Sequence, residues 1–84
     1  MNVLQGSFVK SMAGHDKGTY FVAVRVDEKY VYIADGKERK LESPKRKNIK
    51  HISVTTEIIE LSEITNKKLR KLLNEYGLKV NNIS

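Results

Sequence analysis

The stretch GSFVKSMAGHDKGTYFVAVRV, residues 6–26, decides the fold of this chain. It sets two glycines, Gly14 and Gly18, around a His-Asp-Lys tip, with a short extended segment before them and a longer alternating one after. Glycine reaches backbone conformations closed to other residues, and a period of two with β-branched residues is typical of a half-buried strand. The stretch therefore predicts two strands joined by a tight loop that exposes backbone amides and a lysine.

Further short strands are expected on the C-terminal side of this unit. The expected elements are a strand at 30–34, a hairpin turn at Asp35-Gly36, a charged edge strand at 37–41, a basic loop at 42–47 and a returning strand at 48–54. Within residues 20–26, we expect one face to carry Val22, Val24 and Val26, and the other Phe21, Ala23 and Arg25. Four or five short strands with tight turns predict a mainly β fold, a small SH3-like barrel.

The period changes near the C-terminus. One helical stripe is formed by Leu69, Leu72, Leu73 and Tyr76, at i, i+3, i+4 and i+7. Thr65 is the expected N-cap and Gly77 the expected stop. We expect the helix to complete the core by capping the barrel, rather than to bind a partner. The predicted organisation is a barrel at residues 1–55 and a helical extension at 56–84, in one domain.

The net charge of +6 is concentrated before residue 52. Residues 1–51 hold eleven Lys/Arg against six Asp/Glu, whereas residues 52–84 hold five against four. The densest block carries Lys37, Arg39, Lys40, Lys45, Arg46, Lys47 and Lys50 against Glu38 and Glu42. Such a block attracts polyanions through counterion release and steering. The simpler alternative is a solvated turn that keeps a small protein soluble.

Several function classes lack the residues they need. The chain has no cysteine, and its two histidines, His15 and His51, stand apart without an acidic ligand group beside them, so we expect no metal and no cofactor. No nucleophile elbow or phosphate-binding P-loop is present, which predicts a non-catalytic protein. The N-terminus has no signal-peptide pattern and no apolar run spans a membrane, so a cytoplasmic location is expected, as a monomer.

Three motifs together carry a family resemblance. They are S-x-A-G-H-D-K-G at 11–18, Y-x-x-x-A-D-G-K at 30–37 and K-L-x-x-P-K-x-K-x-x-K-H at 40–51. This combination resembles the KOW-domain ribosomal proteins of archaea and eukaryotes, in particular the eukaryotic-type large-subunit protein fourteen, and more closely the short bacterial KOW-domain RNA-binding proteins related to it. The resemblance implies an SH3-like barrel that docks on structured RNA, above all ribosomal RNA.

The resemblance and the charge pattern together name the candidate RNA-binding residues. They are Gly14, His15, Asp16, Lys17 and Gly18 in the loop, and Lys37, Arg39, Lys40, Lys45, Arg46, Lys47, Lys50 and His51 in the basic tract. We expect Lys17 to contact a phosphate and His15 a base or ribose, while Asp16 caps the turn. The tract has few aromatic residues, which favours recognition of phosphates and shape over base stacking.

Two alternatives stay open at this stage. Tyr30 and Tyr32 share a strand face, where they can stack on bases or, as we expect, pack against the helix. The whole domain can also be a protein-interaction module of the SH3-like or KOW type in transcription or translation, with an apolar groove and weak salt dependence.

Overall fold

The computed structural model describes residues 2–81, which form five strands and one C-terminal helix. The elements are β1 (Ser7–Ser11), β2 (Tyr20–Val26), β3 (Tyr30–Ala34), β4 (Lys45–Asn48), the 3-10 turn η1 (Ile49–His51), β5 (Ile52–Ile58) and α1 (Asn66–Asn81). All neighbouring strands are antiparallel, in the order β4-β3-β2-β1-β5. A mainly β fold with a C-terminal helix is confirmed.

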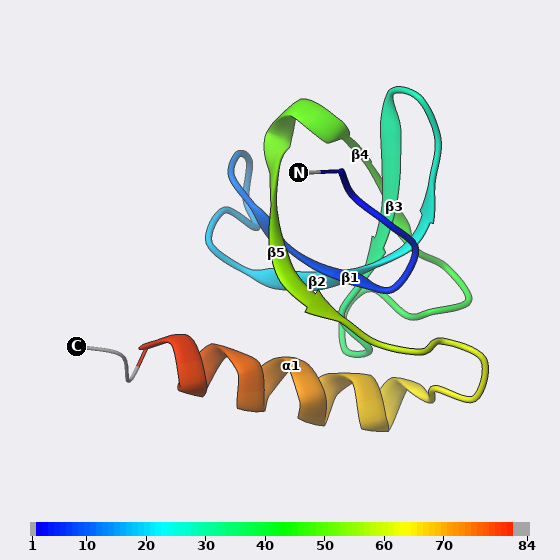
Figure 1. Cartoon of the computed structure of the whole chain (residues 1–84), viewed down its shortest axis with the longest axis vertical. Helices are drawn as coiled ribbons and strands as arrows, with labels where there is room; N and C mark the ends of the chain where they lie inside the picture. The colour runs from blue at the N-terminus through cyan, green and yellow to red at the C-terminus, as the bar shows by residue number, and fades with distance from the viewer. Residues whose placement is uncertain (1, 82–84) are drawn as a thin grey trace.

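The sheet is strongly curved. β4 and β5 lie at its opposite edges, yet only the three residues of η1 separate them along the chain. A flat sheet cannot place its two edges that close together, and Figure 1 shows β4 and β5 curling to the side of β1 and β2 that faces away from α1. No ladder joins β4 to β5 within residues 2–81, so the sheet is open along that line.

Each face of the sheet has its own apolar cluster. The concave face buries Val9, Phe21, Ala23, Val31 and Ile33. The opposite face buries Phe8, Val22 and Ala34 under Leu69 and Leu73 of α1. Because apolar clusters lie on both faces of β1 to β3, the central residues of these strands are buried on both sides, and the helix is an integral layer of the core.

The helix follows the predicted stripe but not the predicted end. Thr65 caps it, since its Oγ1 accepts from the Lys68 amide at 3.1 Å, and Tyr76 packs edge-on against Phe8 and Tyr20 with ring centroids 5.4 and 5.3 Å apart. The expected stop at Gly77 is wrong, because α1 runs on to Asn81. A glycine ends a helix by taking positive φ, and Gly77 is absent from the four described glycines that do so.

The segment between β3 and β4 also differs from expectation. Residues 37–41 form no strand. The strand that pairs with β3 is Lys45–Asn48, which takes up the second half of the expected basic loop and the first residue of the expected returning strand. The cause is Asp35, whose carboxylate accepts from the Lys37 and Arg39 amides at 2.9 Å each and so removes both from strand pairing. Pairing resumes only after Pro44.

A bulge in β2 changes the predicted alternation. The register with β3 shifts between Ala23 and Arg25, so that Arg25 lies opposite Tyr32 and Val26 opposite Val31. Beyond the bulge Val26 therefore packs in the concave cluster with Phe21, and not on the face of Val22 as expected. One extra residue in a strand moves the side chains that follow it to the opposite face of the sheet.

Candidate nucleic-acid interface

The loop between β1 and β2 is a compact double turn. Gly14 and Gly18 take positive φ, 86° and 91°, as the sequence indicated. The Lys17 amide donates to the Gly14 carbonyl at 3.2 Å, and the Gly18 amide donates to the Ser11 carbonyl at 2.8 Å. These bonds fold the tip back on the strand ends and leave His15, Lys17 and Gly18 exposed.

Asp16 is the anchor of this loop. Its Oδ1 accepts from Ser11 Oγ and from Lys47 Nζ at 2.6 Å each, and its Oδ2 accepts from Lys45 Nζ at 3.0 Å. Partial burial alone would raise the pKa of Asp16, but the hydrogen bonds from Lys47, Ser11 and Lys45 outweigh it and hold that pKa well below its ordinary range. Asp16 is thus more than a turn former, because it ties the loop to β4.

The two β4 lysines consequently have a structural role. Lys47 is 8% exposed, and its ammonium also donates to the Ala13 carbonyl at 2.7 Å. Lys45 is half-buried beside it. Within residues 2–81 these two lysines form the two ion pairs that the structure contains, both with Asp16. Of the basic tract predicted from the sequence, this part is committed to folding the loop.

The other predicted cations are exposed and have no ion-pair partner within residues 2–81. They are His15, Lys17, Lys37, Arg39, Lys40, Arg46, Lys50 and His51. Antiparallel order puts the β1–β2 and β3–β4 loops at the same end of the sheet, and η1 lies beside the first of them, since the Met12 amide donates to the His51 carbonyl at 2.8 Å. Most of the predicted site is therefore brought together at one end of the fold.

Tyr30 and Tyr32 do not pack on the helix, so that expectation is wrong. The Arg46 guanidinium lies over the ring of Tyr30, 4.6 Å from its centroid, and Arg25 lies over the ring of Tyr32 at 4.0 Å. The β2 bulge is what brings Arg25 onto the face of Tyr32. The result is an Arg-Tyr surface on the part of the outer face that α1 leaves uncovered.

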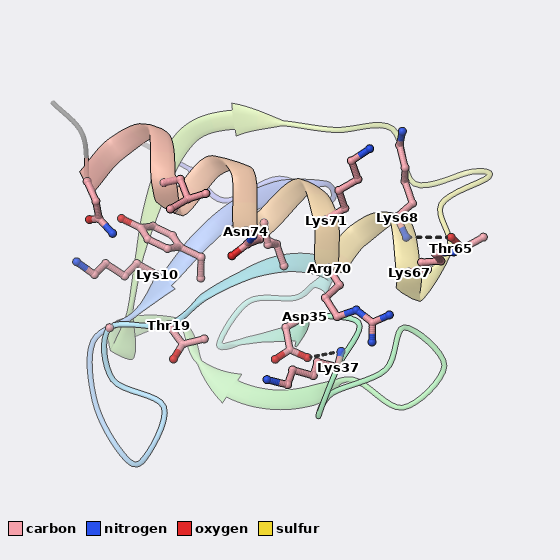
Figure 2. A pocket seen from close by; sticks show the side chains of 16 residues that line it. Lys10, Thr19, Asp35, Lys37, Thr65, Lys67, Lys68, Arg70, Lys71 and Asn74 are labelled. Carbon is pink, nitrogen blue, oxygen red and sulfur yellow. Dashed lines mark hydrogen bonds between the residues drawn. The ribbon is translucent and has the colours of Figure 1, made fainter.

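A groove between α1 and the sheet was missed by the sequence analysis. It has a volume of about 1030 Å³ and runs along α1 above the start of β2 and the turn at Asp35 (Figure 2). Its cationic lining consists of Lys10, Lys37, Lys67, Lys68, Arg70 and Lys71. Gly18 and Lys37 belong both to this groove and to the predicted site. The run KKLRK at 67–71 was the available signal, but the helix had been assigned to core completion.

The comparisons with known proteins add no relative. No known family profile matches the chain, and no curated protein matches it. Among the described residues no helix is long and apolar enough to cross a membrane. Residues 2–81 also contain no group of three or more His, Cys, Asp or Glu side chains arranged to hold a metal ion.

Proposed function

We propose that this chain is a non-catalytic RNA-binding protein of the KOW type, an SH3-like barrel that associates with ribosomal RNA in the cytoplasm. The observation that carries the proposal is a set of exposed cations that have no ion-pair partner within residues 2–81. They lie around a glycine-bracketed loop between two antiparallel strands. The curvature of the sheet and the short η1 connection between its edges support the barrel.

The internal neutralisation of Asp16 supports a polyanion as partner. A free carboxylate at the loop tip would repel phosphates, but this one is half-buried and accepts from two ammonium groups and a hydroxyl. Lys17 at the tip and Lys50 in η1 are exposed, and neither forms an ion pair with a carboxylate within residues 2–81. The loop thus offers a net positive, internally braced surface.

Binding on this surface would rest on phosphates and shape. The braced loop is ordered before RNA arrives, so little conformational entropy is lost when it binds. Arg46 and Arg25, each held over a tyrosine ring, add guanidinium groups in fixed positions on the outer face of the sheet, toward the β2–β3 turn. Arginine held in this way suits phosphate recognition.

The test is sedimentation of native lysate through a density gradient at low and high salt. We expect the protein to migrate with ribosomal particles at low salt and to leave them at high salt, because each neutralised phosphate contributes a slope of about 0.7 to 0.9 to the salt dependence of binding. The double variant Lys17→Gln/Lys50→Gln should be lost from the particles at lower salt than the wild type.

Its matched control is Lys79→Glu, which lowers the net charge by the same two units at an exposed position outside the surface. Lys79 lies in the last turn of α1. Lys29 is unsuitable as a control, because its carbonyl accepts from the Ile49 amide of η1 at 2.9 Å, beside Lys50. Light fractions at both salt concentrations would overturn ribosome association, and salt-insensitive co-migration would favour a protein partner.

A further inference from the structure

We infer that the groove along α1 is a second RNA contact, in which the phosphates of a single RNA strand are held by cations of the helix. This inference rests on the proposed RNA-binding function and extends it to a surface outside the loop and the basic tract. It assigns Lys67, Arg70 and Lys71 to RNA binding, which the sequence pattern had not done.

The charge of the groove points to an anion. Six cationic side chains line it, against the single carboxylate of Asp35. That carboxylate already accepts two backbone amides, at 2.9 Å each. The acid of α1, Glu75, does not line the groove. None of the six cations has an ion-pair partner among residues 2–81.

The first turn of α1 has an unfavourable electrostatic interaction that a bound anion would reduce. It contains Lys67 and Lys68 and no acidic residue, although the N-terminal end of a helix is its positive pole. Cations placed there interact unfavourably with the helix dipole. Figure 2 shows Arg70 reaching from the next turn toward Asp35 and Lys37 across the groove, which concentrates positive charge further.

The shape of the groove favours a strand over a small phosphorylated molecule. Its lining extends from Thr65 to Asn81, the whole length of α1, which at 1.5 Å per residue is about 24 Å. A positively charged groove of this length can follow a nucleic-acid backbone. The nearby Tyr20 ring is already in contact with Tyr76, and Lys10 lies over it at 5.6 Å, so phosphates are the expected contacts and stacked bases are not.

The groove is continuous with the proposed RNA surface. Gly18 closes the β1–β2 loop and Lys37 begins the basic tract, and both line the groove. An RNA strand bound at the loop can therefore continue along α1 in contact with the protein. This continuity is why we assign the groove to RNA and not to an acidic peptide, which would match its charge equally well.

The variant that tests the inference is Lys67→Gln/Arg70→Gln. Both side chains line the groove, and neither belongs to the loop or the basic tract. Glutamine has nearly the same helix propensity as lysine and arginine, and loss of Lys67 relieves the first turn, so folding should be unaffected. Circular dichroism checks this. The control is again Lys79→Glu, with an identical change in net charge.

Binding would be measured by fluorescence anisotropy with a labelled oligouridine of about ten nucleotides, over a series of salt concentrations. We expect the groove variant to weaken binding by about tenfold, and the control by less than about twofold. The salt slope should fall by about 1.4, which is about 0.7 for each of two single-strand phosphate contacts.

The outcomes separate this inference from the proposed function. Equal affinities of the groove variant and the control, with Lys17→Gln/Lys50→Gln still weakened on structured ribosomal RNA, would overturn the groove alone. A wild type that binds neither RNA would overturn the proposed function. A groove variant that keeps its RNA affinity but loses binding to a polyglutamate peptide would reassign the groove to an acidic protein partner.

Discussion

Two groups of cations in this small protein differ in whether a carboxylate pairs with them. On β4, Lys45 and Lys47 both donate to Asp16, and Lys47 is 8% exposed. On α1, Lys67 and Arg70 line an open groove and have no ion-pair partner within residues 2–81. In the sequence the β4 lysines belong to the densest basic block, and the α1 cations to the segment with almost balanced charge. The tertiary fold reverses that ranking.

The difference shows that availability for binding depends on where the acidic groups lie. Asp16 is far from β4 along the chain, and only the curvature of the sheet brings the two together. In α1, Glu75 lies off the groove, so no acidic residue of the helix itself neutralises the cations that line it. A count of lysines along the chain registers neither relationship.

The largest effect is expected from Asp16→Asn. It removes the carboxylate from two ammonium groups, one of them almost fully buried, and an unpaired buried charge is costly. We expect the free energy of unfolding to fall by about 2 to 4 kcal/mol, measured by urea denaturation. The control is Asp27→Asn, an exposed turn residue whose Oδ1 accepts from the Lys29 and Tyr30 amides and whose asparagine keeps both bonds.

Acid provides an independent check on the same contact. The pKa of Asp16 in the fold lies below its ordinary value of 3.8, so its contribution to stability is present above pH 3.8 and is lost as the pH falls further. The stability of the wild type should therefore fall more steeply below about pH 4 than that of Asp16→Asn. Parallel curves for the two proteins would mean that the β4 lysines are not committed to Asp16, and the contrast with α1 would disappear.

A smaller loss of stability is expected from Gly36→Ala, which changes the contact between the β3–β4 loop and α1 beside the groove. Gly36 has a φ of 78°, and an added Cβ would lie 2.3 Å from the Asn66 carbonyl oxygen at the start of α1. That carbonyl is backbone and cannot turn away, so the loop must move off the helix. We expect a loss of about 2 kcal/mol in unfolding free energy, together with weaker oligouridine binding.

Gly18→Ala is the matched control for the effect of φ. Gly18 has a φ of 91°, but an added Cβ there would meet nothing within 4 Å. The free energy of unfolding of this variant should fall by about 1 kcal/mol, because alanine in the left-handed conformation is strained but meets no neighbouring atom. If both variants lose the same amount, the close approach of the β3–β4 loop to α1 does not contribute to stability.

Periodicity and glycine spacing predicted much of the fold. The β1–β2 unit, the loop between Gly14 and Gly18 and the helical stripe were all predicted, because each depends on contacts that are local in sequence. The errors lie where a distant or single-residue effect decides: the Asp35 carboxylate that captures two amides, and the bulge that moves Val26 to the concave face. The alternation of apolar and polar residues in a strand predicts neither the Asp35 hydrogen bonds nor the β2 bulge.

The candidate site was predicted in part for the same reason. Exposed loop cations such as Lys17 and Lys50 follow from local chemistry, whereas the pairing of Lys47 with Asp16 requires the curved sheet. The groove requires knowing which helix face remains after Leu69 and Leu73 are buried, and which loop stands opposite it.

The smallest expected change is a gain in stability, from a substitution in the C-terminal half of α1, beside the groove. Gly77 lies inside α1 with ordinary helical φ, and an added Cβ would meet nothing within 4 Å. Alanine is favoured over glycine in a helix interior because it loses less backbone freedom on folding. Gly77→Ala should therefore raise the free energy of unfolding by about 0.5 to 1 kcal/mol, seen as a higher urea midpoint with an unchanged slope.

The same variant should leave oligouridine binding unchanged, since it alters no charge in the groove. A loss of stability would mean that the helix ends at Gly77 in the left-handed conformation, as the sequence pattern first indicated. The groove would then be confined to the first turns of α1, where Lys67, Arg70 and Lys71 lie. RNA contacts would survive there, but the length of strand that the protein holds would be shorter.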